Sequence, residues 1–316
     1  MENSLPDLSQ ILTPSLYQKV FANQFPWPQE SPLDFAFVSE YMFEAEPKRK
    51  TELQKTWYPA LKTLSLIPFP EAEELDLTTY LPAPTSPDFA WQAFALRVLL
   101  DQGPRIMFGG DTIDVRWTNG FFDVLSNKLT SQFLELPEDL QPWNSKQWPS
   151  KVHFEFLMPV NVWWLAALAH SEILANHDIA VKHTEVIRNL IEERTGTVDP
   201  YRADKELLAT DVHAFGRMLR KGTPKPDAEG MVKLEEFMFW MLTVIDVHRP
   251  IIQRYGRYPY RNGALGRTST EDEVKWLDVN AGLGTVDDAV ATRIREDVEA
   301  GRWTPLGESR EEIVSS

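Results

Sequence analysis

Apolar positions repeat with a helical period along most of the chain, and the strongest pattern lies near residue 90. Apolar residues recur at helical spacing from Phe89 to Leu100, and further apolar residues fill the opposite side. Ser86–Pro87 supplies a start signal for this helix, and Gly103–Pro104 predicts its end. A helix without a polar face has to be covered by other elements, so we expect it at the centre of the fold.

Amphipathic patterns predict further helices in the rest of the chain. Thr270 and Glu273 form a capping box that starts one of them, over residues 271–277. The others are predicted over residues 119–136, 160–177, 178–196, 203–222, 231–248 and 285–301. Alternating strand patterns joined by two-residue turns are absent from the sequence. The pattern therefore predicts an all-α fold, a helical array of antiparallel helix pairs.

The same pattern predicts a single domain over residues 1–316 with three regions. Prolines and aromatic residues are dense in residues 1–85, which predicts short helices joined by irregular loops. Residues 86–277 carry the long helical patterns and should form the core. Residues 278–316 should form a C-terminal helix and tail.

The balance of charge argues against partners such as nucleic acids or anionic membranes. Acidic residues outnumber Lys and Arg by 47 to 32, whereas phosphate binding requires an excess of cations. The absence of cysteine excludes disulfides and thiolate metal sites. The most apolar stretch, residues 156–169, contains Pro159 and Asn161 and is shorter than the ~20 residues of a membrane span. Since the N-terminus shows no secretory signal, we expect a cytoplasmic protein.

The sequence also lacks the familiar cofactor motifs. It has no dinucleotide-binding fingerprint, no phosphate-binding P-loop, no nucleophile elbow and no zinc-protease motif, so we predict no cofactor. His170, His177 and His183 lie close together in sequence. On one continuous helix, however, His183 would lie roughly 120° from His177, so the three rings would not converge. We therefore predict no metal site.

Polar residues gather where the buried helices are predicted to end. Residues 101–105 follow the first central helix, and residues 170–172 follow the second. The segment Arg254–Arg267 follows the third and holds four arginines and three tyrosines without an acid. Such groups at the ends of buried helices would lie partly inside the protein.

Buried charges are costly unless they are paired. We therefore expect the carboxylates of Asp101 and Glu172 to pair with three arginines, namely Arg105, Arg257 and Arg261. Two interpretations of this charged lattice stay open. It either pins three helices together and does nothing else, or it also faces a ligand pocket.

Three of these segments resemble a known family. The stretches LLDQGPR (Leu99–Arg105), HSE (His170–Glu172) and IIQRYGRYPYRNGALGRTSTEDE (Ile251–Glu273) are similar, in that order, to signature blocks of a bacterial and fungal family named domain of unknown function 924. The resemblance covers residues 89–277. It implies an all-α, tetratricopeptide-like fold, and it implies no established activity.

The chain departs from the family pattern beside the charged residues. Gly103 stands where the family has Phe, and Tyr260 stands where it has His. The charged and amide residues that match the pattern are Asp101, Arg105, Glu172, Arg257, Arg261 and Asn262. Polar groups around a retained scaffold have become apolar or small, which indicates a pocket adapted to a more hydrophobic ligand.

These observations lead to the hypothesis of a cofactor-independent enzyme of secondary metabolism. Its partner would be a hydrophobic small-molecule substrate in an aromatic-lined helical cavity. The reaction would be a cyclisation, an isomerisation or a pericyclic step such as a Diels–Alder cycloaddition. The substrate would be shaped by Trp163, Trp164, Trp117 and Phe108, and the proton or hydrogen bond would come from Tyr260, His170 or His177. The supporting residues would be Asp101, Gln102, Arg105, Glu172, Arg257, Arg261 and Asn262.

Two alternative functions stay open. One is a helical-repeat interaction module whose concave face binds a peptide or another protein. The other is an enzyme that binds phosphate or carboxylate through Arg257 and Arg261. Aromatic side chains that line an open groove would favour the interaction module, whereas aromatic side chains enclosed in a cavity would favour catalysis. A sulfate or phosphate bound between Arg257 and Arg261 would favour the anion-binding enzyme.

The substitution Tyr260→Phe provides a first test. It removes the hydroxyl and keeps the ring, so we expect the packing and the fold to be retained. Thermal unfolding followed by circular dichroism should give a midpoint within about 2 °C of the wild type. Loss of cooperative unfolding would contradict a functional assignment of Tyr260, because the hydroxyl would then be needed for the fold.

Overall fold

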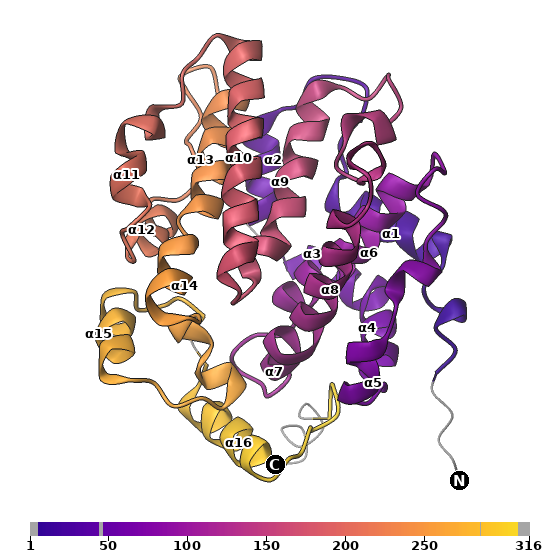
Figure 1. Cartoon of the computed structure of the whole chain (residues 1–316), viewed down its shortest axis with the longest axis vertical. Helices are drawn as coiled ribbons and strands as arrows, with labels where there is room; N and C mark the ends of the chain where they lie inside the picture. The colour runs from indigo at the N-terminus through magenta and orange to yellow at the C-terminus, as the bar shows by residue number, and fades with distance from the viewer. Residues whose placement is uncertain (1–5, 44–46, 285, 309–316) are drawn as a thin grey trace.

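The computed structural model describes residues 6–43, 47–284 and 286–308. These residues form helices joined by loops, and no strand occurs among them (Figure 1). The predicted all-α fold is therefore confirmed. A continuous hydrophobic core includes residues from Leu8 near one end of the described chain to Leu306 near the other.

The helix α6 (Phe89–Met107) lies at the centre of this core, as its all-round apolar pattern predicts. Nearly every residue from Phe89 to Pro104 is buried. The helix is covered by α1 (Pro14–Gln24), α4 (Tyr58–Leu64) and α8 (Asp123–Leu134), which pack against it. Because α6 contacts so many elements, its register determines where the polar residues at its end are placed.

The predicted end of α6 at Gly103–Pro104 is wrong, since the helix continues to Met107. Proline removes one helical hydrogen bond, and this cost is normally enough to end a helix. Here the tertiary packing outweighs it, because a Cβ atom at Gly103 would lie only 3.2 Å from the Trp57 ring and 3.3 Å from Leu61. The missing side chain lets α4 pack directly on this turn of α6.

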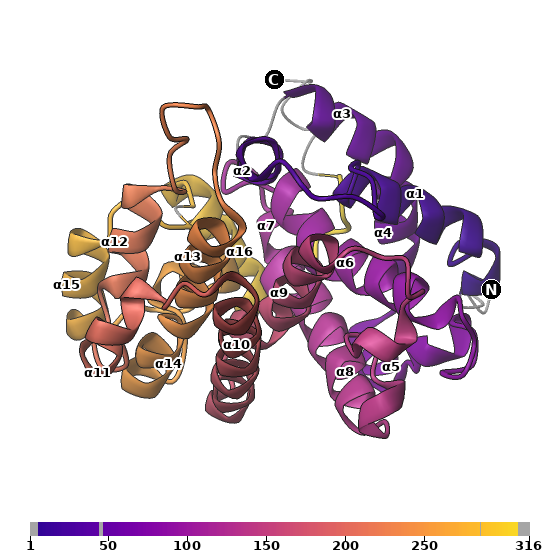
Figure 2. The same cartoon turned by 90° about the horizontal axis from the view of Figure 1, so that it is seen from above.

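The second half of the chain is built around α9 (Phe154–His170), α10 (Leu174–Thr195) and α13 (Leu234–Asp246), which pack against one another. Figure 2 shows these three helices side by side next to α6. The single helix predicted over residues 160–177 is wrong, because α9 ends at His170 and α10 starts only at Leu174. The predicted end of α10 at Gly196 is confirmed by a left-handed φ of 72°.

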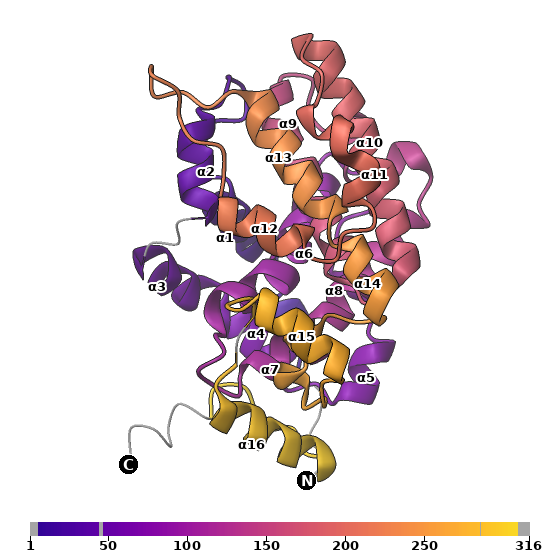
Figure 3. The same ribbon diagram turned by 90° about the vertical axis from the view of Figure 1, so that its left-hand side faces the viewer.

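The remaining elements are shorter. In Figure 3, α12, α14 and α15 follow one another down the face turned towards the viewer. The capping box of Thr270 and Glu273 is present at the start of α15. The other α-helices are α2 (Phe35–Phe43), α3 (Pro47–Thr56), α5 (Phe69–Glu74), α7 (Val115–Trp117), α11 (Lys205–Leu208), α12 (Ala214–Lys221), α14 (Arg249–Tyr255), α15 (Glu271–Val279) and α16 (Asp288–Glu299). The 3-10 turns are η1 (Leu8–Gln10), η2 (Leu77–Tyr80), η4 (Glu138–Leu140), η5 (Ser145–Gln147), η6 (Pro200–Asp204), η7 (Pro259–Arg261) and η8 (Gly263–Leu265), and η3 (Thr118–Phe122) is a π-helical turn.

The end of the described chain returns to the first half of the fold. The Trp303 ring stacks on Phe69, with ring centroids 6.0 Å apart, and also contacts Trp117. The side chain of Lys62 donates to the carbonyl of Leu306. These contacts join the C-terminal segment to α4, α5 and α7.

The packing at Gly103 generates a stability prediction. The substitution Gly103→Leu inserts a side chain into the space filled by Trp57 and Leu61. We expect the free energy of unfolding in denaturant to fall by about 1–3 kcal/mol. The control Lys182→Leu, at an exposed position of α10, should change it by less than about 0.5 kcal/mol. Equal effects of the two substitutions would contradict the tight contact between α4 and α6.

Candidate functional site

A network of buried ion pairs lies where α6, α8 and η7 meet. Asp101 is fully buried, and its carboxylate lies 3.2 Å from Nη1 of Arg105 and 3.7 Å from Nη2 of Arg97. The carboxylate of Asp123, the first residue of α8, lies 2.8 Å from Nη1 of Arg105 and 3.4 Å from Nη1 of Arg261. The network therefore joins three arginines to two aspartates.

The local structure of the chain explains this arrangement. Arg97, Asp101 and Arg105 follow one another at intervals of four residues, which places them on one face of α6. Arg105 keeps this register because the helix continues through Pro104. The π-helical turn η3 comes directly before Asp123, and such turns often occur at functional sites.

The imidazole of His170, the last residue of α9, is attached to the network. Its Nδ1 lies 2.7 Å from Oδ1 of Asp101, and its backbone carbonyl accepts a hydrogen bond of 2.8 Å from Nη1 of Arg261. An ionised carboxylate can only accept, so Nδ1 carries the proton and Nε2 keeps its lone pair. The ring is therefore held in the orientation and tautomer of a general base.

The electrostatics of the site support these protonation states. Burial alone would raise the pKa of Asp101, but the interaction with the His170 ring and the positive charges of Arg105 and Arg97 hold it well below its ordinary value. Burial, reinforced by the charge of Arg105, lowers the pKa of His170 below 6.5, although Asp101 acts in the opposite direction. Near neutral pH, Asp101 is therefore ionised and His170 is neutral.

A cavity of about 290 Å³ lies beside these groups. Its polar side chains include Arg105, His170, His248, Tyr260 and Arg261. Apolar surface comes from Phe108, Val115, Phe215 and Ala264. None of the described residues that line the cavity is a carboxylate, because Asp101 and Asp123 do not reach its wall. The charged side chains in the wall are therefore two arginines.

A family model described as "Bacterial protein of unknown function (DUF924)" matches residues 38–281, about three quarters of the chain. The chain belongs to this family. No curated protein and no solved structure matches it significantly. The match extends beyond the resemblance over residues 89–277, because it begins in α2 and includes α3 to α5. In the DUF924 fold seen here, these N-terminal helices are therefore part of the family core.

The ion pairs of this DUF924 chain confirm the predicted contact of Asp101 with Arg105 and correct two others. Glu172 does not pair with Arg257 or Arg261; its carboxylate lies 2.7 Å from Nη1 of Arg267 and accepts from the backbone N–H of Tyr258. Arg257 instead lies 2.6 Å from Glu273. Glu273 lies 16 positions after Arg257 in the chain, and the capping box fixes its side chain, because its Oε2 accepts from the backbone N–H of Thr270.

Most of the aromatic residues predicted to shape a substrate lie outside the cavity wall. Phe108 lines the cavity. Trp164 is 1% exposed and packs edge-on against core aromatic rings such as Phe94. Trp117 donates to the carbonyl of Thr304 and packs against the C-terminal segment. Trp163 packs against the core, so the tryptophans contribute to packing rather than to this wall.

The other predicted residues divide between the cavity and its surroundings. Tyr260 lines the cavity, and Gly284 packs so closely on its ring that a Cβ atom there would lie 2.6 Å away. Gln102 donates to Asp101. His177 does not line this cavity; its Nε2 lies 2.8 Å from the carbonyl oxygen of Ser171. The amide of Asn262 donates to the hydroxyl of Ser269, 3.0 Å away, and Asn262 does not line this cavity.

Three residues of the site were missed by the sequence patterns: Arg97, Asp123 and His248. Each had a detectable signal, because Arg97 and Asp123 are isolated charges within apolar helical segments. His248 follows the apolar stripe of α13 by helical spacing. A single polar residue on a buried apolar helix face therefore indicates a buried polar contact. The partner in that contact can be identified only from the three-dimensional structure.

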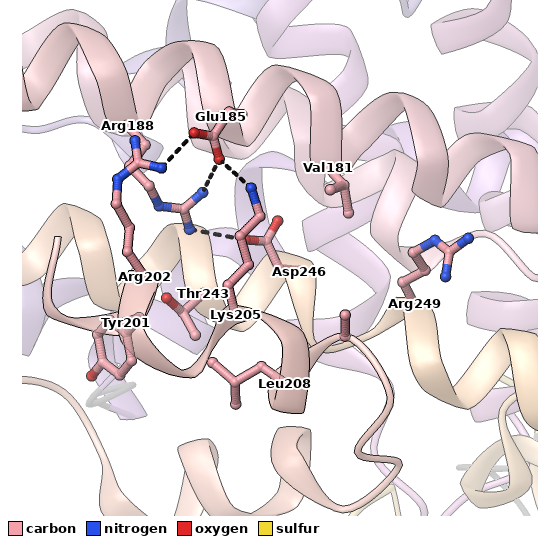
Figure 4. Close-up of a pocket in the computed structure, with 11 residues that line it drawn as sticks. Val181, Glu185, Arg188, Tyr201, Arg202, Lys205, Leu208, Thr243, Asp246 and Arg249 are labelled. Atoms are coloured by element: carbon pink, nitrogen blue, oxygen red, sulfur yellow. Dashed lines mark hydrogen bonds and ion pairs between the residues drawn. The ribbon is translucent and has the colours of Figure 1, made fainter.

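A second cavity, of about 250 Å³, lies between α10, η6, α11 and α13 (Figure 4). Its cations are paired with carboxylates: Arg188 with Asp199 and Asp246, Arg202 and Lys205 with Glu185, and Arg249 with Asp178. Figure 4 shows that the side chains of Arg188, Arg202 and Lys205 all approach the carboxylate of Glu185. Because its charged side chains are paired within the protein, this cavity does not favour a charged ligand in the way that the cavity lined by Arg105 and Arg261 does.

The described residues contain no group of three or more His, Asp or Glu side chains arranged to hold a metal ion. Among the helices that the structure describes, none is long and apolar enough to cross a membrane.

The buried histidines make stability depend on pH. Burial lowers the pKa of His177 from 6.5 to about 4 and also lowers that of His170 and His248. The unfolded chain therefore binds more protons below 6.5, and stability falls as the pH falls. For His177 the loss amounts to at most about 3 kcal/mol.

Denaturant unfolding measured between pH 7.5 and about 4.5 checks this expectation. The free energy of unfolding should decrease steadily below pH 6.5, the ordinary value of histidine. His177→Gln should flatten part of this decrease. A wild-type profile that stays level over this range would contradict a neutral, buried state of the three rings.

Proposed function

We propose that this chain is an enzyme that binds a small anionic metabolite at Arg105 and Arg261 and moves a proton with His170. The observation that carries the proposal is the position of His170 between the carboxylate of Asp101 and a cavity whose charged wall residues are both arginines. The substrate class is a carboxylate or phosphate compound. The apolar part of the wall suits a short hydrocarbon portion of the same molecule.

The charge balance of the network supports an anionic ligand. Three arginines face two aspartates, and all five side chains are largely removed from water. An uncompensated charge in such surroundings is costly. An anion in the cavity would offset the excess positive charge, and the planar guanidinium groups of Arg105 and Arg261 suit the oxygens of carboxylate and phosphate.

The orientation of His170 supports a catalytic role in addition to binding. Asp101 accepts the Nδ1 proton and stabilises the imidazolium that forms when Nε2 takes a proton. The proton would come from the bound substrate or from a water molecule beside it. The two arginines would stabilise negative charge that develops on the substrate during this step.

The anion hypothesis fits the cavity better than the hypothesis of an aromatic-lined pocket for a hydrophobic substrate. Phe108 is the one predicted substrate-shaping aromatic residue in the described wall of the cavity, whereas Trp164 and Trp117 are occupied with core contacts. Of the two arginines predicted to hold an anion, Arg261 lines the cavity, and Arg105 takes the place of Arg257.

Sulfate binding tests the proposal. Wild-type protein titrated with sulfate, followed by calorimetry, should bind one sulfate per chain. Arg261→Gln removes one of the two wall arginines and should weaken the binding by about tenfold or more. Because Arg261 is buried in the network, its loss should also lower stability, so circular dichroism is used to verify that the variant is folded before the titration.

Arg254→Gln serves as the matched control. Arg254 belongs to the same segment but forms an exposed pair with Asp272, so sulfate affinity should change by less than about twofold. The proposal is wrong if wild-type protein binds no sulfate, or if Arg254→Gln and Arg261→Gln weaken binding equally.

A further inference from the structure

His248 lines the same cavity, although the sequence pattern did not single it out as a site residue. It lies between α13 and α14, is 4% exposed, and packs against Phe215 with ring centroids 4.1 Å apart and the planes tilted by 46°. Its Nδ1 lies 2.7 Å from the backbone carbonyl oxygen of Val244. A carbonyl oxygen can only accept, so Nδ1 carries the proton and Nε2 keeps a lone pair.

His170 and His248 are therefore held in the same tautomer by different partners. Asp101 fixes Nδ1 of His170, and Val244 fixes Nδ1 of His248. The two ring centroids lie 6.2 Å apart, with the planes at 70°, and both rings line the cavity that contains Arg105 and Arg261. Two imidazoles that each keep an Nε2 lone pair thus line one small cavity with two fixed cations.

A third histidine shows that this arrangement is specific. His177 is buried nearby, with its ring centroid 6.2 Å from that of Tyr258. It uses the other nitrogen, because its Nε2 donates to the carbonyl of Ser171, and it does not line the cavity. Burial beside this network therefore does not by itself give a histidine a lone pair in the cavity.

We infer that His248 is a second proton-transferring residue of this site and works with His170 on one bound anion. The inference rests on the proposed function and narrows it to a reaction class. Two imidazoles beside one substrate suit a proton shift between two positions of a small carboxylate or phosphate compound, in which the product is an isomer of the substrate.

The proton balance of this step needs no oxidant or reductant. An anion that enters the cavity offsets the excess charge of the arginines, so one imidazole takes up a proton from solvent at Nε2. The neutral imidazole then accepts a proton from a carbon of the substrate, and the charged one returns a proton at a second position. The two rings exchange protonation states, and the extra proton returns to solvent when the product leaves.

Sulfate is a suitable probe because it does not titrate near neutral pH. Full-length protein labelled with ¹⁵N in its histidines is titrated with sulfate, and the ring nitrogens are followed by long-range ¹H–¹⁵N spectroscopy. Before sulfate is added, His170 and His248 should show a protonated Nδ1, and His177 a protonated Nε2. During the titration, the Nε2 signals of His170 and His248 should shift with the same apparent Kd, while His177 stays unchanged.

The outcomes separate the two hypotheses. A shift of His170 without a shift of His248, or a protonated Nε2 on His248 in the free protein, would overturn the inference and leave the anion site intact. The absence of a shift in both rings would overturn the proposed function together with the inference. Because this experiment uses the wild-type chain, it does not depend on the folding of a variant.

Proton uptake tests the transfer role itself. Sulfate binding is measured by calorimetry near pH 7 in buffers of different ionisation enthalpy, which gives the number of protons taken up with the anion. His248→Asn keeps a donor for the carbonyl of Val244 and removes Nε2. We expect it to reduce proton uptake by about twofold or more while sulfate still binds. His177→Gln, which keeps a donor for Ser171, should leave the uptake unchanged, and an unchanged uptake in His248→Asn would overturn the inference.

Discussion

The ionised carboxylate of Asp101 is the interaction on which the rest of the site depends. It is fully buried in α6 and contacts cations of its own helix and the imidazole of α9. Through Arg105 the same charge is linked to Asp123 in α8 and from there to Arg261 in η7. Removing one partner from such a buried network typically costs about 3–5 kcal/mol, because the other charges stay behind. The packing of α6, α8, α9 and η7 and the orientation of the His170 ring therefore depend on the same buried ion-pair network.

The parts of the fold that depend on local sequence could be predicted. The central position of α6 followed from its apolar pattern, and the start of α15 followed from the capping box of Thr270 and Glu273. The end of α6 could not be predicted from Gly103–Pro104, because the rule for helix ends is local and the opposing contact with Trp57 is 46 positions away in sequence. Because this distant contact accompanies the last turn of α6, the position of Arg105 on the helix could not be predicted from local sequence patterns.

The residue types of the site could be predicted better than its pairings. Asp101, Arg105, His170 and Arg261 stood out because charges follow buried helices, and all four meet in the structure. The partner of each arginine, however, depends on distances between side chains that only the fold defines, as the Arg257–Glu273 pair shows. The tryptophans were ambiguous for a similar reason. A large ring is equally suited to a core and to a pocket wall, and its sequence context does not distinguish between them.

Arg97 explains why the site carries a surplus of positive charge. It is fully buried, its guanidinium nitrogens have no hydrogen-bond partner among the described residues, and burial lowers its pKa to about 10, so it stays charged near neutral pH. Without this charge, Asp101 and Asp123 would balance Arg105 and Arg261, and the cavity would have little electrostatic preference. With it, the network favours a negative ligand, and the arginines of the network that line the cavity are Arg105 and Arg261. Arg97 does not line the cavity, yet its charge is the reason why the ligand is expected to be negative.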